Sequence, residues 1–232
     1  MCIFKSKFKG DDEIIYRNKF SEFRYKAFLF LEKIYKKYID AKDQRLQIIV
    51  DNINKAKPKR ILEIGSGTFP IYSYLPNKLK QNIHYYICEV NKKKVDYLKK
   101  NYKKINVDCS EAVHLPYKNN FFDFVFSKGV LHHIDSIDAK EREKIRLDFL
   151  LESKRVLKDG GSNLLMDFSY EKRRLSDIIW HFLHKVFLYE GEHNFYSMKV
   201  TKSLFKTANY KDITGNEFVT YKGFYYYLIA KK

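Results

Sequence analysis

Long apolar runs and an even number of cysteines are both missing from this chain of 232 residues. Apolar stretches such as Ala27–Leu31 and Ile178–Tyr189 are short or broken by polar residues, and none approaches the roughly 18–20 uninterrupted apolar residues of a membrane-spanning helix. The chain runs from Met1 to the acidic Asp11 without an apolar core, so we expect no secretory signal. Three cysteines, an odd number without metal-ligand spacing, favour reduced thiols and a cytoplasmic protein.

Acidic residues are scarce relative to basic ones. The 28 Asp and Glu against 45 Lys and Arg give a formal net charge of +17, and the excess is spread along the whole chain. One interpretation is a surface that binds the phosphates of RNA or of an anionic membrane. The other is that lysines solvate exposed faces, and we favour it because discrete basic patches mark nucleic-acid-binding proteins. Nucleic acid is therefore a possible but not a favoured partner, and the oligomeric state is left open.

Glycine and proline occur only nine and four times, so each of them is informative. Glycine is the residue that readily adopts a positive φ or lets a ligand touch the backbone. Five of the nine glycines lie beside short apolar runs, at Gly65, Gly67, Gly129, Gly160 and Gly161. These positions are the first places to look for tight turns and ligand contacts.

Hydrophobic periodicity divides the chain near residue 57. Before it, apolar residues recur at three- and four-residue intervals, which predicts an N-terminal helical cap over residues 1–57. Beyond it, residues 58–232 show short apolar runs that alternate with helix-length segments, which predicts parallel crossover units. The tail differs, because two aromatic-rich stretches, 210–220 and 224–230, predict an antiparallel hairpin at the edge of the sheet.

The same patterns predict the individual elements. We expect a helix opened by Pro70, further helices over 92–102 and 141–157, and strands over 60–64, 83–88, 105–107, 121–126 and 161–168. The expected fold class is therefore α/β: a Rossmann-like, doubly wound, mostly parallel sheet of seven strands, with the C-terminal hairpin and the N-terminal cap.

The first predicted strand ends in a turn that suits a nucleoside ligand. Gly65-Ser66-Gly67 follows the strand directly, and such a turn lets a ligand approach the backbone at the carboxyl end of a parallel sheet. Glu89 ends the next strand, where a carboxylate can accept both hydroxyls of a ribose, and Val90 can pack against a base. A dinucleotide fingerprint needs glycine where this chain has Pro70, whereas a single nucleoside without phosphates makes no such demand.

Four short motifs follow one another in order within residues 58–170: ILEIGSG at 61–67, EAVHLPY at 111–117, FFDFVFS at 121–127 and RVLKDGG at 155–161. Together with LHHI at 131–134, they closely resemble the class I S-adenosylmethionine-dependent methyltransferases, and most strongly their small-molecule type 11 branch. The resemblance implies S-adenosyl-L-methionine as the cofactor and a small-molecule acceptor whose O, N or C atom is methylated by in-line displacement.

The resemblance also implies roles for the residues of the first turn. Glu63 would support the amino-acid end of the cofactor, and Gly65, Ser66 and Gly67 would form the turn against it. One departure concerns Phe69, which stands where the family often has a third glycine. Its side chain is expected to narrow the cofactor pocket or to require a slightly rebuilt turn.

Two further strand ends are expected to hold the adenosine. By the resemblance, Glu89 would bind the ribose hydroxyls and Val90 would cover one adenine face. Glu111 would read the adenine amine, with the Ala112 amide nearby, and Asp108 is a rival for that role three residues earlier.

The fourth strand leads to the candidate catalytic residues. The backbone of Ser127 would receive the methionine amino group, and His132 and His133 follow beside the expected methyl group. A hydroxyl or ammonium acceptor must lose a proton, and histidine is suited to remove it near neutral pH. The alternative is that His132 caps a loop or hydrogen-bonds Asp135.

Other histidines carry weaker hypotheses. His181 and His184 have helical spacing, but without glutamate in the required places they are interpreted as a helix face, so no metal site is predicted. His193 is a second base candidate or, as we prefer, an exposed loop residue.

Alternative functions keep the same fold. An RNA methyltransferase gains from the charge, but residues 127–130 read Ser-Lys-Gly-Val instead of the Asn/Asp-Pro-Pro-aromatic run of base-amine methylases. A non-catalytic cofactor-binding subunit is suggested by Phe69, and a nicotinamide-dependent oxidoreductase is more distant.

Overall fold

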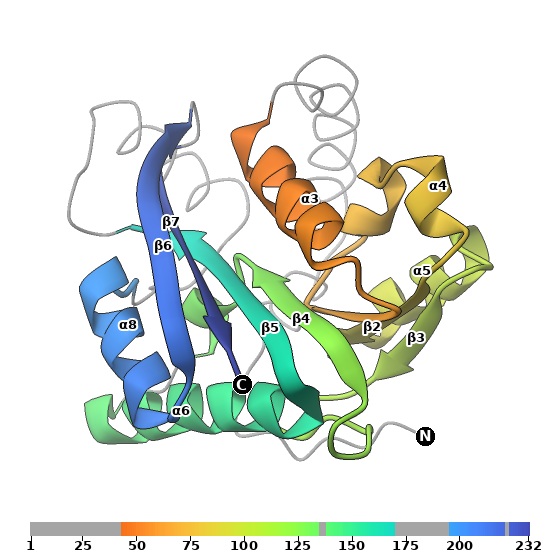
Figure 1. Cartoon of the computed structure of the whole chain (residues 1–232). Coiled ribbons are helices and arrows are strands. Elements are labelled where there is room, and N and C mark those ends of the chain that lie inside the picture. Colours follow the sequence, from red (N-terminus) through yellow and green to blue (C-terminus); the bar gives the residue numbers. More distant parts are fainter. Residues whose placement is uncertain (1–42, 135–137, 170–194, 221–222) are drawn as a thin grey trace.

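The computed structural model of the chain describes residues 43–134, 138–169, 195–220 and 223–232 (Figure 1). Most of the predicted N-terminal cap lies outside these ranges. So do Asp135 and the stretch that contains His181, His184 and His193. In the part that is described, no helix combines the length and the apolar character required to cross a bilayer.

One sheet of seven strands organises the molecule, in the order β3-β2-β1-β4-β5-β7-β6. The strands are β1 Arg60–Ile64, β2 His84–Glu89, β3 Asn106–Cys109, β4 Phe122–Lys128, β5 Leu157–Phe168, β6 Lys211–Thr220 and β7 Gly223–Lys231. Strands β1 to β5 pair in parallel, and β7 runs antiparallel between β5 and β6. The predicted fold class, with its C-terminal hairpin at the edge, is confirmed. Strand order reverses between β1 and β4, where folds of this kind bind ligands at the carboxyl ends of the strands.

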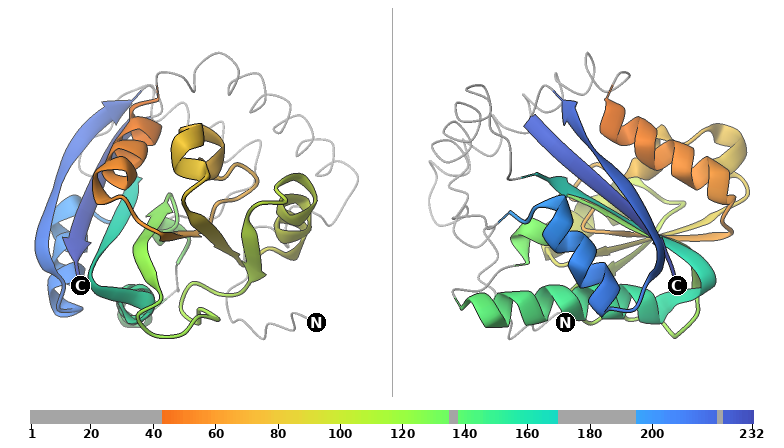
Figure 2. Two further views of the ribbon diagram at one scale, coloured as in Figure 1. Left: turned by 45° about the vertical axis from the view of Figure 1, so that its right-hand side comes forward. Right: turned by 60° about the vertical axis from the view of Figure 1, so that its left-hand side comes forward.

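Helices cover both faces of the sheet (Figure 2). On one face lie α3 Gln44–Ala56, the 3-10 helix η2 Ile71–Tyr74, α4 Asn77–Lys80 and α5 Lys92–Asn101. On the other lie α6 Ala139–Val156 and α8 Met198–Thr207. The apolar side chains of each layer form one of two buried clusters, so β1 and β4 are buried almost throughout. Helix α3 shares a cluster with the sheet, and the division of the chain at residue 57 stays a prediction.

Short polar side chains set the starts of the main helices. Asp43 accepts from the amide of Arg45 at the start of α3, and Asn91 accepts from two amides at the start of α5. Asp138 and Ser197 cap α6 and α8 in the same way. Each of these residues satisfies amides that would otherwise lack a partner within the helix.

The prediction of a helix opened by Pro70 was only partly right. Pro70 precedes the 3-10 helix η2, which has four residues, and the chain then passes Pro76 into α4, which also has four. A proline biases the residue before it away from helical geometry and lacks an amide hydrogen, so Pro76 ends the first helical segment after one turn. The amide of Ile71, the first residue of η2, donates to the Glu63 carboxylate of β1, with an N–O distance of 3.1 Å.

Candidate functional site

The turn after β1 has the backbone geometry that the sequence predicts. Gly65 and Gly67 have φ values of +69° and +61°, in the left-handed region that favours glycine. A Cβ atom added to Gly65 would lie 2.6 Å from Cγ2 of Val130, whereas one added to Gly67 would meet nothing within 4 Å. The turn is therefore packed against the chain after β4 on one side and has open space beside Gly67 on the other.

Glu89 is directed at this turn from the end of β2. Its side chain is buried, with 5% exposed, and its two carboxylate oxygens accept from the amides of Gly67 at 3.0 Å and Asn91 at 3.1 Å. Each oxygen retains capacity for a further donor. Val90, the next residue, is half exposed, which is unusual for a large apolar side chain after a buried strand. The structure thus brings together the turn, the carboxylate and the apolar side chain.

Glu63 lies beneath the turn on the face that α3 covers. It is buried and accepts hydrogen bonds from the hydroxyl of Tyr85 at 2.6 Å and from the amide of Ile71. Burial raises the pKa of Glu63 to about 7, although the Tyr85 bond, the charge of Lys128 and the Ile71 amide act to lower it. The side chain therefore braces the turn through three elements: β1, β2 and η2.

A buried histidine–aspartate pair lies at the carboxyl ends of β4 and β5. Nδ1 of His132 is 2.6 Å from Oδ1 of Asp167, and the two residues are 6% and 2% exposed. The backbone amides of His132 and Phe168 also donate to this carboxylate, at 3.2 Å and 2.7 Å. The histidine belongs to a 3-10 turn, η3 Leu131–His133, directly after β4.

The protonation state of Asp167 determines which nitrogen of the His132 imidazole carries a proton. Burial acts to raise the pKa of Asp167, but the charge and the hydrogen bond of His132, with the Phe168 amide, outweigh burial and hold the pKa below its ordinary value. The carboxylate is therefore ionised at neutral pH and can only accept, so Nδ1 of His132 carries a proton. Deprotonated imidazole then has its basic lone pair on Nε2.

Asp167 is a site residue that the sequence analysis missed. The alternative to a catalytic role was that His132 caps a loop or hydrogen-bonds Asp135, and Asp135 lies outside the described residues. The structure shows that His132 pairs with a carboxylate 35 residues away in sequence. One signal was present, because Asp167 is the penultimate residue of a buried strand, much as Glu89 is the last residue of another. The ring of His133 is tilted by 40° against that of His132, with ring centroids 4.0 Å apart, and the rings of Phe168 and Phe195 also contact His132.

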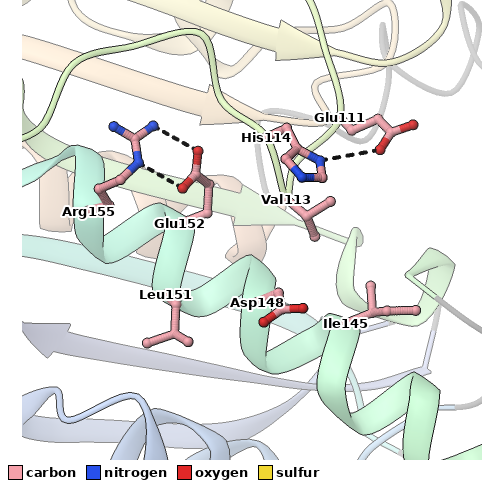
Figure 3. Close-up of a pocket in the computed structure, with 8 residues that line it drawn as sticks. All are labelled: Glu111, Val113, His114, Ile145, Asp148, Leu151, Glu152 and Arg155. Carbon is pink, nitrogen blue, oxygen red and sulfur yellow. Dashed lines mark hydrogen bonds and ion pairs between the residues drawn. The ribbon is translucent and has the colours of Figure 1, made fainter. Parts of the chain in front are cut away.

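The acidic residues after β3 have a different neighbourhood. Oε2 of Glu111 is 3.7 Å from Nδ1 of His114, and Asp108 accepts from the hydroxyl of Tyr117 at 2.8 Å. Glu111 lines a hollow of about 430 Å³ beside α6, together with Val113, His114, Ile145, Asp148, Leu151, Glu152 and Arg155 (Figure 3). The glycine turn and Glu89 do not line that hollow. Neither carboxylate is thus brought against the turn by a contact, and the adenine role of Glu111 and Ala112 stays a prediction.

The remaining predicted residues surround the turn. Ser127 is buried in β4 and is in register with Ile64, the last residue of β1. Ser66 is half-buried, and its hydroxyl donates to the carbonyl of Gly67 at 3.2 Å. Phe69 is half-buried just beyond the turn. With this aromatic residue in place, Gly65 and Gly67 still have positive φ angles.

Comparisons with known proteins find a methyltransferase domain in the sequence and methyltransferases among solved structures of similar fold. Residues 62–165 match a family model described as a methyltransferase domain. No protein of curated function matches the sequence. The fold is similar to that of a SAM-dependent methyltransferase from Aquifex aeolicus, with a TM-score of 0.54 and 19% identity over 78% of this chain and 87% of that one.

Two other solved structures have the same fold. A possible histamine N-methyltransferase from Thermotoga maritima gives a TM-score of 0.58 and 16% identity, covering 86% of this chain and 98% of that one. Human N-acetylserotonin methyltransferase in complex with SAM gives a TM-score of 0.66 and 13% identity, covering 98% of this chain and 60% of that one.

Proposed function

Because residues 62–165 match a methyltransferase domain and the fold is that of S-adenosylmethionine-dependent methyltransferases, we propose that the chain is a class I S-adenosylmethionine-dependent methyltransferase and that it methylates a small-molecule metabolite on an O, N or C atom. S-adenosylmethionine is its cofactor. The observation that carries the proposal is the buried His132–Asp167 pair at the carboxyl ends of β4 and β5. His132 lies two residues after Val130, whose side chain packs against Gly65 of the turn. The cysteine count supports the cytoplasm as the location within this proposal.

The residues at the turn fit an adenosyl group. Open space beside Gly67 leaves room for a ligand at the backbone, and the Glu89 carboxylate has acceptor capacity for two ribose hydroxyls. Half-exposed Val90 offers an apolar surface for a base. In the proposal Gly65, Ser66 and Gly67 hold the ligand by their backbone while Glu63 braces the turn from below.

When bound, the cofactor supplies a methyl group activated by a sulfonium centre. The chain itself then has to align the acceptor, exclude water and remove a proton where the acceptor is a hydroxyl or an ammonium. In our proposal His132 accepts that proton at Nε2, and Asp167 orients the ring and stabilises the imidazolium that forms. His133 packs against the ring and is the second candidate base.

Two observations support a small acceptor over RNA. The first is the burial of the His132–Asp167 pair, which suits an acceptor that enters the site as a separate molecule. The second is the sequence after β4, which lacks the run typical of base-amine methylases. The names of two structural neighbours, a possible histamine N-methyltransferase and an N-acetylserotonin methyltransferase, also refer to small acceptors.

The test follows a labelled methyl group. Purified protein is incubated with methyl-labelled S-adenosylmethionine and either a low-mass metabolite extract or total RNA. We expect label in the low-mass fraction for the wild type, and a loss of about 100-fold or more for His132→Ala if the acceptor requires a base. His84→Ala is the matched control, because His84 is exposed and begins β2, at the opposite end of that strand from Glu89. Label that appears only in RNA, with binding that weakens steeply with salt, would establish the RNA alternative. Binding of S-adenosylhomocysteine without transfer to either fraction would favour the non-catalytic subunit.

A further inference from the structure

Arg146 in the middle of α6 is the largest of the described side chains that are fully buried, with 0% of its surface exposed. A guanidinium group is charged at every pH at which a protein works. Moving such a charge out of water is costly, and an apolar side chain of similar volume often fills the same space at a lower cost. The burial of Arg146 therefore calls for a role besides filling the core.

The guanidinium of Arg146 reaches back to the turn that carries the candidate base. Its Nε–H group donates to the carbonyl of Ile134 at 2.8 Å. Ile134 directly follows η3, and its own amide donates to the carbonyl of Leu131, the first residue of that turn, at 3.1 Å. Arg146 is thus attached to the end of the turn, two residues after His132.

The same guanidinium contacts a second segment that reaches His132. Its central carbon atom lies over the ring of Tyr196, 4.0 Å from the ring centroid. A cation over an aromatic face is attracted to it, and more strongly where both are removed from water. The ring of Phe195, the residue before Tyr196, is 5.1 Å from that of His132 between centroids. Arg146 is therefore connected to His132 from two sides, along η3 and across the chain before α8.

Asp167, the partner of His132, lies on the sheet face that α6 and α8 cover. It is in register with Tyr226 of β7, which packs in the cluster of that face. Burial raises the pKa of Tyr226, the charge of Asp167 raises it further, and the hydrogen bond to Thr201 and the charge of Arg146 act to lower it. The charges of Arg146 and Asp167 thus act on one buried hydroxyl, which places both residues in the same layer.

We propose that Arg146 is a positioning residue for His132: it fixes the end of η3 and the chain before α8, and so keeps the imidazole against Asp167. The inference rests on the proposed function, in which His132 removes a proton from the acceptor. A histidine base works only when its lone pair is held within hydrogen-bond reach of that proton. In this role Arg146 acts through the protein around His132 and not by contact with the acceptor.

The experiment follows the imidazole itself. Nitrogen-15 NMR of histidine-labelled protein reports which ring nitrogen of neutral His132 carries the proton. In the wild type this is Nδ1, which faces the carboxylate. We expect the ratio of the Nδ1-protonated to the Nε2-protonated ring to fall by about 10-fold or more in Arg146→Met, because the charge-assisted bond to Asp167 is loosened. Arg146→Lys keeps a charge and a donor, so it should restore part of the ratio.

Lys154→Met is the matched control, because Lys154 makes the same kinds of contact from the same helix. Its ammonium group donates to the carbonyls of Ala208 at 2.9 Å and Asn209 at 2.6 Å, and it lies over the ring of Tyr210, 5.5 Å from the centroid. These three residues follow the end of α8, whereas Tyr196 precedes its start. Both methionine variants should be less stable in urea, but Lys154→Met should leave the signals of His132 unchanged.

Transfer of a labelled methyl group to the low-mass fraction gives an independent readout. Arg146→Met should lower kcat by about 10-fold or more, while KM for S-adenosylmethionine changes by less than about twofold. If Arg146→Met does not fold, Tyr196→Leu takes its place: it removes the ring under the guanidinium and should lower the tautomer ratio by about twofold or more.

The outcomes separate this inference from the proposed function. An unchanged tautomer ratio in Arg146→Met, or in Tyr196→Leu where that variant replaces it, would overturn the role of Arg146 and leave the proposed function intact. An equal change in Lys154→Met would do the same, because it would show general loosening of the core. A wild type that transfers no methyl group to a small molecule would overturn the proposed function, and the positioning role with it.

Discussion

Replacing Asp167 with asparagine removes the charge from the buried pair and keeps its size. The carboxylate accepts three hydrogen bonds, from Nδ1 and the amide of His132 and from the amide of Phe168. An asparagine offers one oxygen, so its NH₂ group faces at least one buried donor, which costs about 1–3 kcal/mol. Exchanging a charge-assisted bond for a neutral one adds about 1 kcal/mol. We therefore expect Asp167→Asn to lower the free energy of unfolding by about 2–4 kcal/mol.

Urea unfolding measures this loss, and Asp159→Asn is its control. Asp159 is highly exposed, with 88% of its side chain accessible, so its substitution should change stability by less than about 0.5 kcal/mol. Asp167→Asn should also move the imidazole titration of His132, followed by NMR, to lower pH, because an ionised carboxylate at 2.6 Å favours the protonated ring. Affinity for S-adenosylhomocysteine should stay within about twofold. Equal stabilities for the two variants, or an unmoved titration, would refute the pairing.

Two further predictions concern the turn and its support. In urea unfolding, the free energy of unfolding of Gly65→Ala should be about 1–3 kcal/mol lower than that of Gly67→Ala. Both glycines have a positive φ, but only a Cβ atom at residue 65 would collide with Val130. Equal losses of stability in the two variants would contradict that packing. Glu63 has a folded-state pKa of about 7, above its ordinary 4.5, so folding favours its protonated form and stability is lost as pH rises through this window. Between pH 4.5 and pH 8, the free energy of unfolding of the wild type should fall by on the order of 3 kcal/mol relative to that of Glu63→Gln. If the unfolding free energies of the two proteins change in parallel with pH, Glu63 does not titrate in this range.

Local features of the site were predictable from the sequence because they depend on neighbouring residues. A buried strand followed by two glycines predicts a turn with positive φ, and Gly65 and Gly67 have it. An acidic residue at the end of the next parallel strand must lie near that turn, and the contact between Glu89 and Gly67 follows from this geometry. The seven-stranded sheet was predictable for a similar reason, since hydrophobic periodicity separates strands from helices.

Features that depend on distant residues were not predictable. Asp167 and His132 meet only because β4 pairs with β5, so no local pattern identifies them as partners. The spacing of the EAVHLPY motif gives the position of Glu111 but not the direction of its side chain, which lies near His114. The helix expected after Pro70 is a 3-10 helix of four residues, because Pro76 follows in the same stretch of sequence.

The most direct measurement is a calorimetric titration of S-adenosylhomocysteine into the wild type and Glu89→Ala. In the proposed placement of the cofactor on the glycine turn, the carboxylate of Glu89 would hold the ribose beside Gly67. The wild type should therefore bind the ligand, and the variant should lose about 1–3 kcal/mol of binding free energy while it remains folded. Unchanged affinity in Glu89→Ala would contradict the placement of the cofactor on this turn.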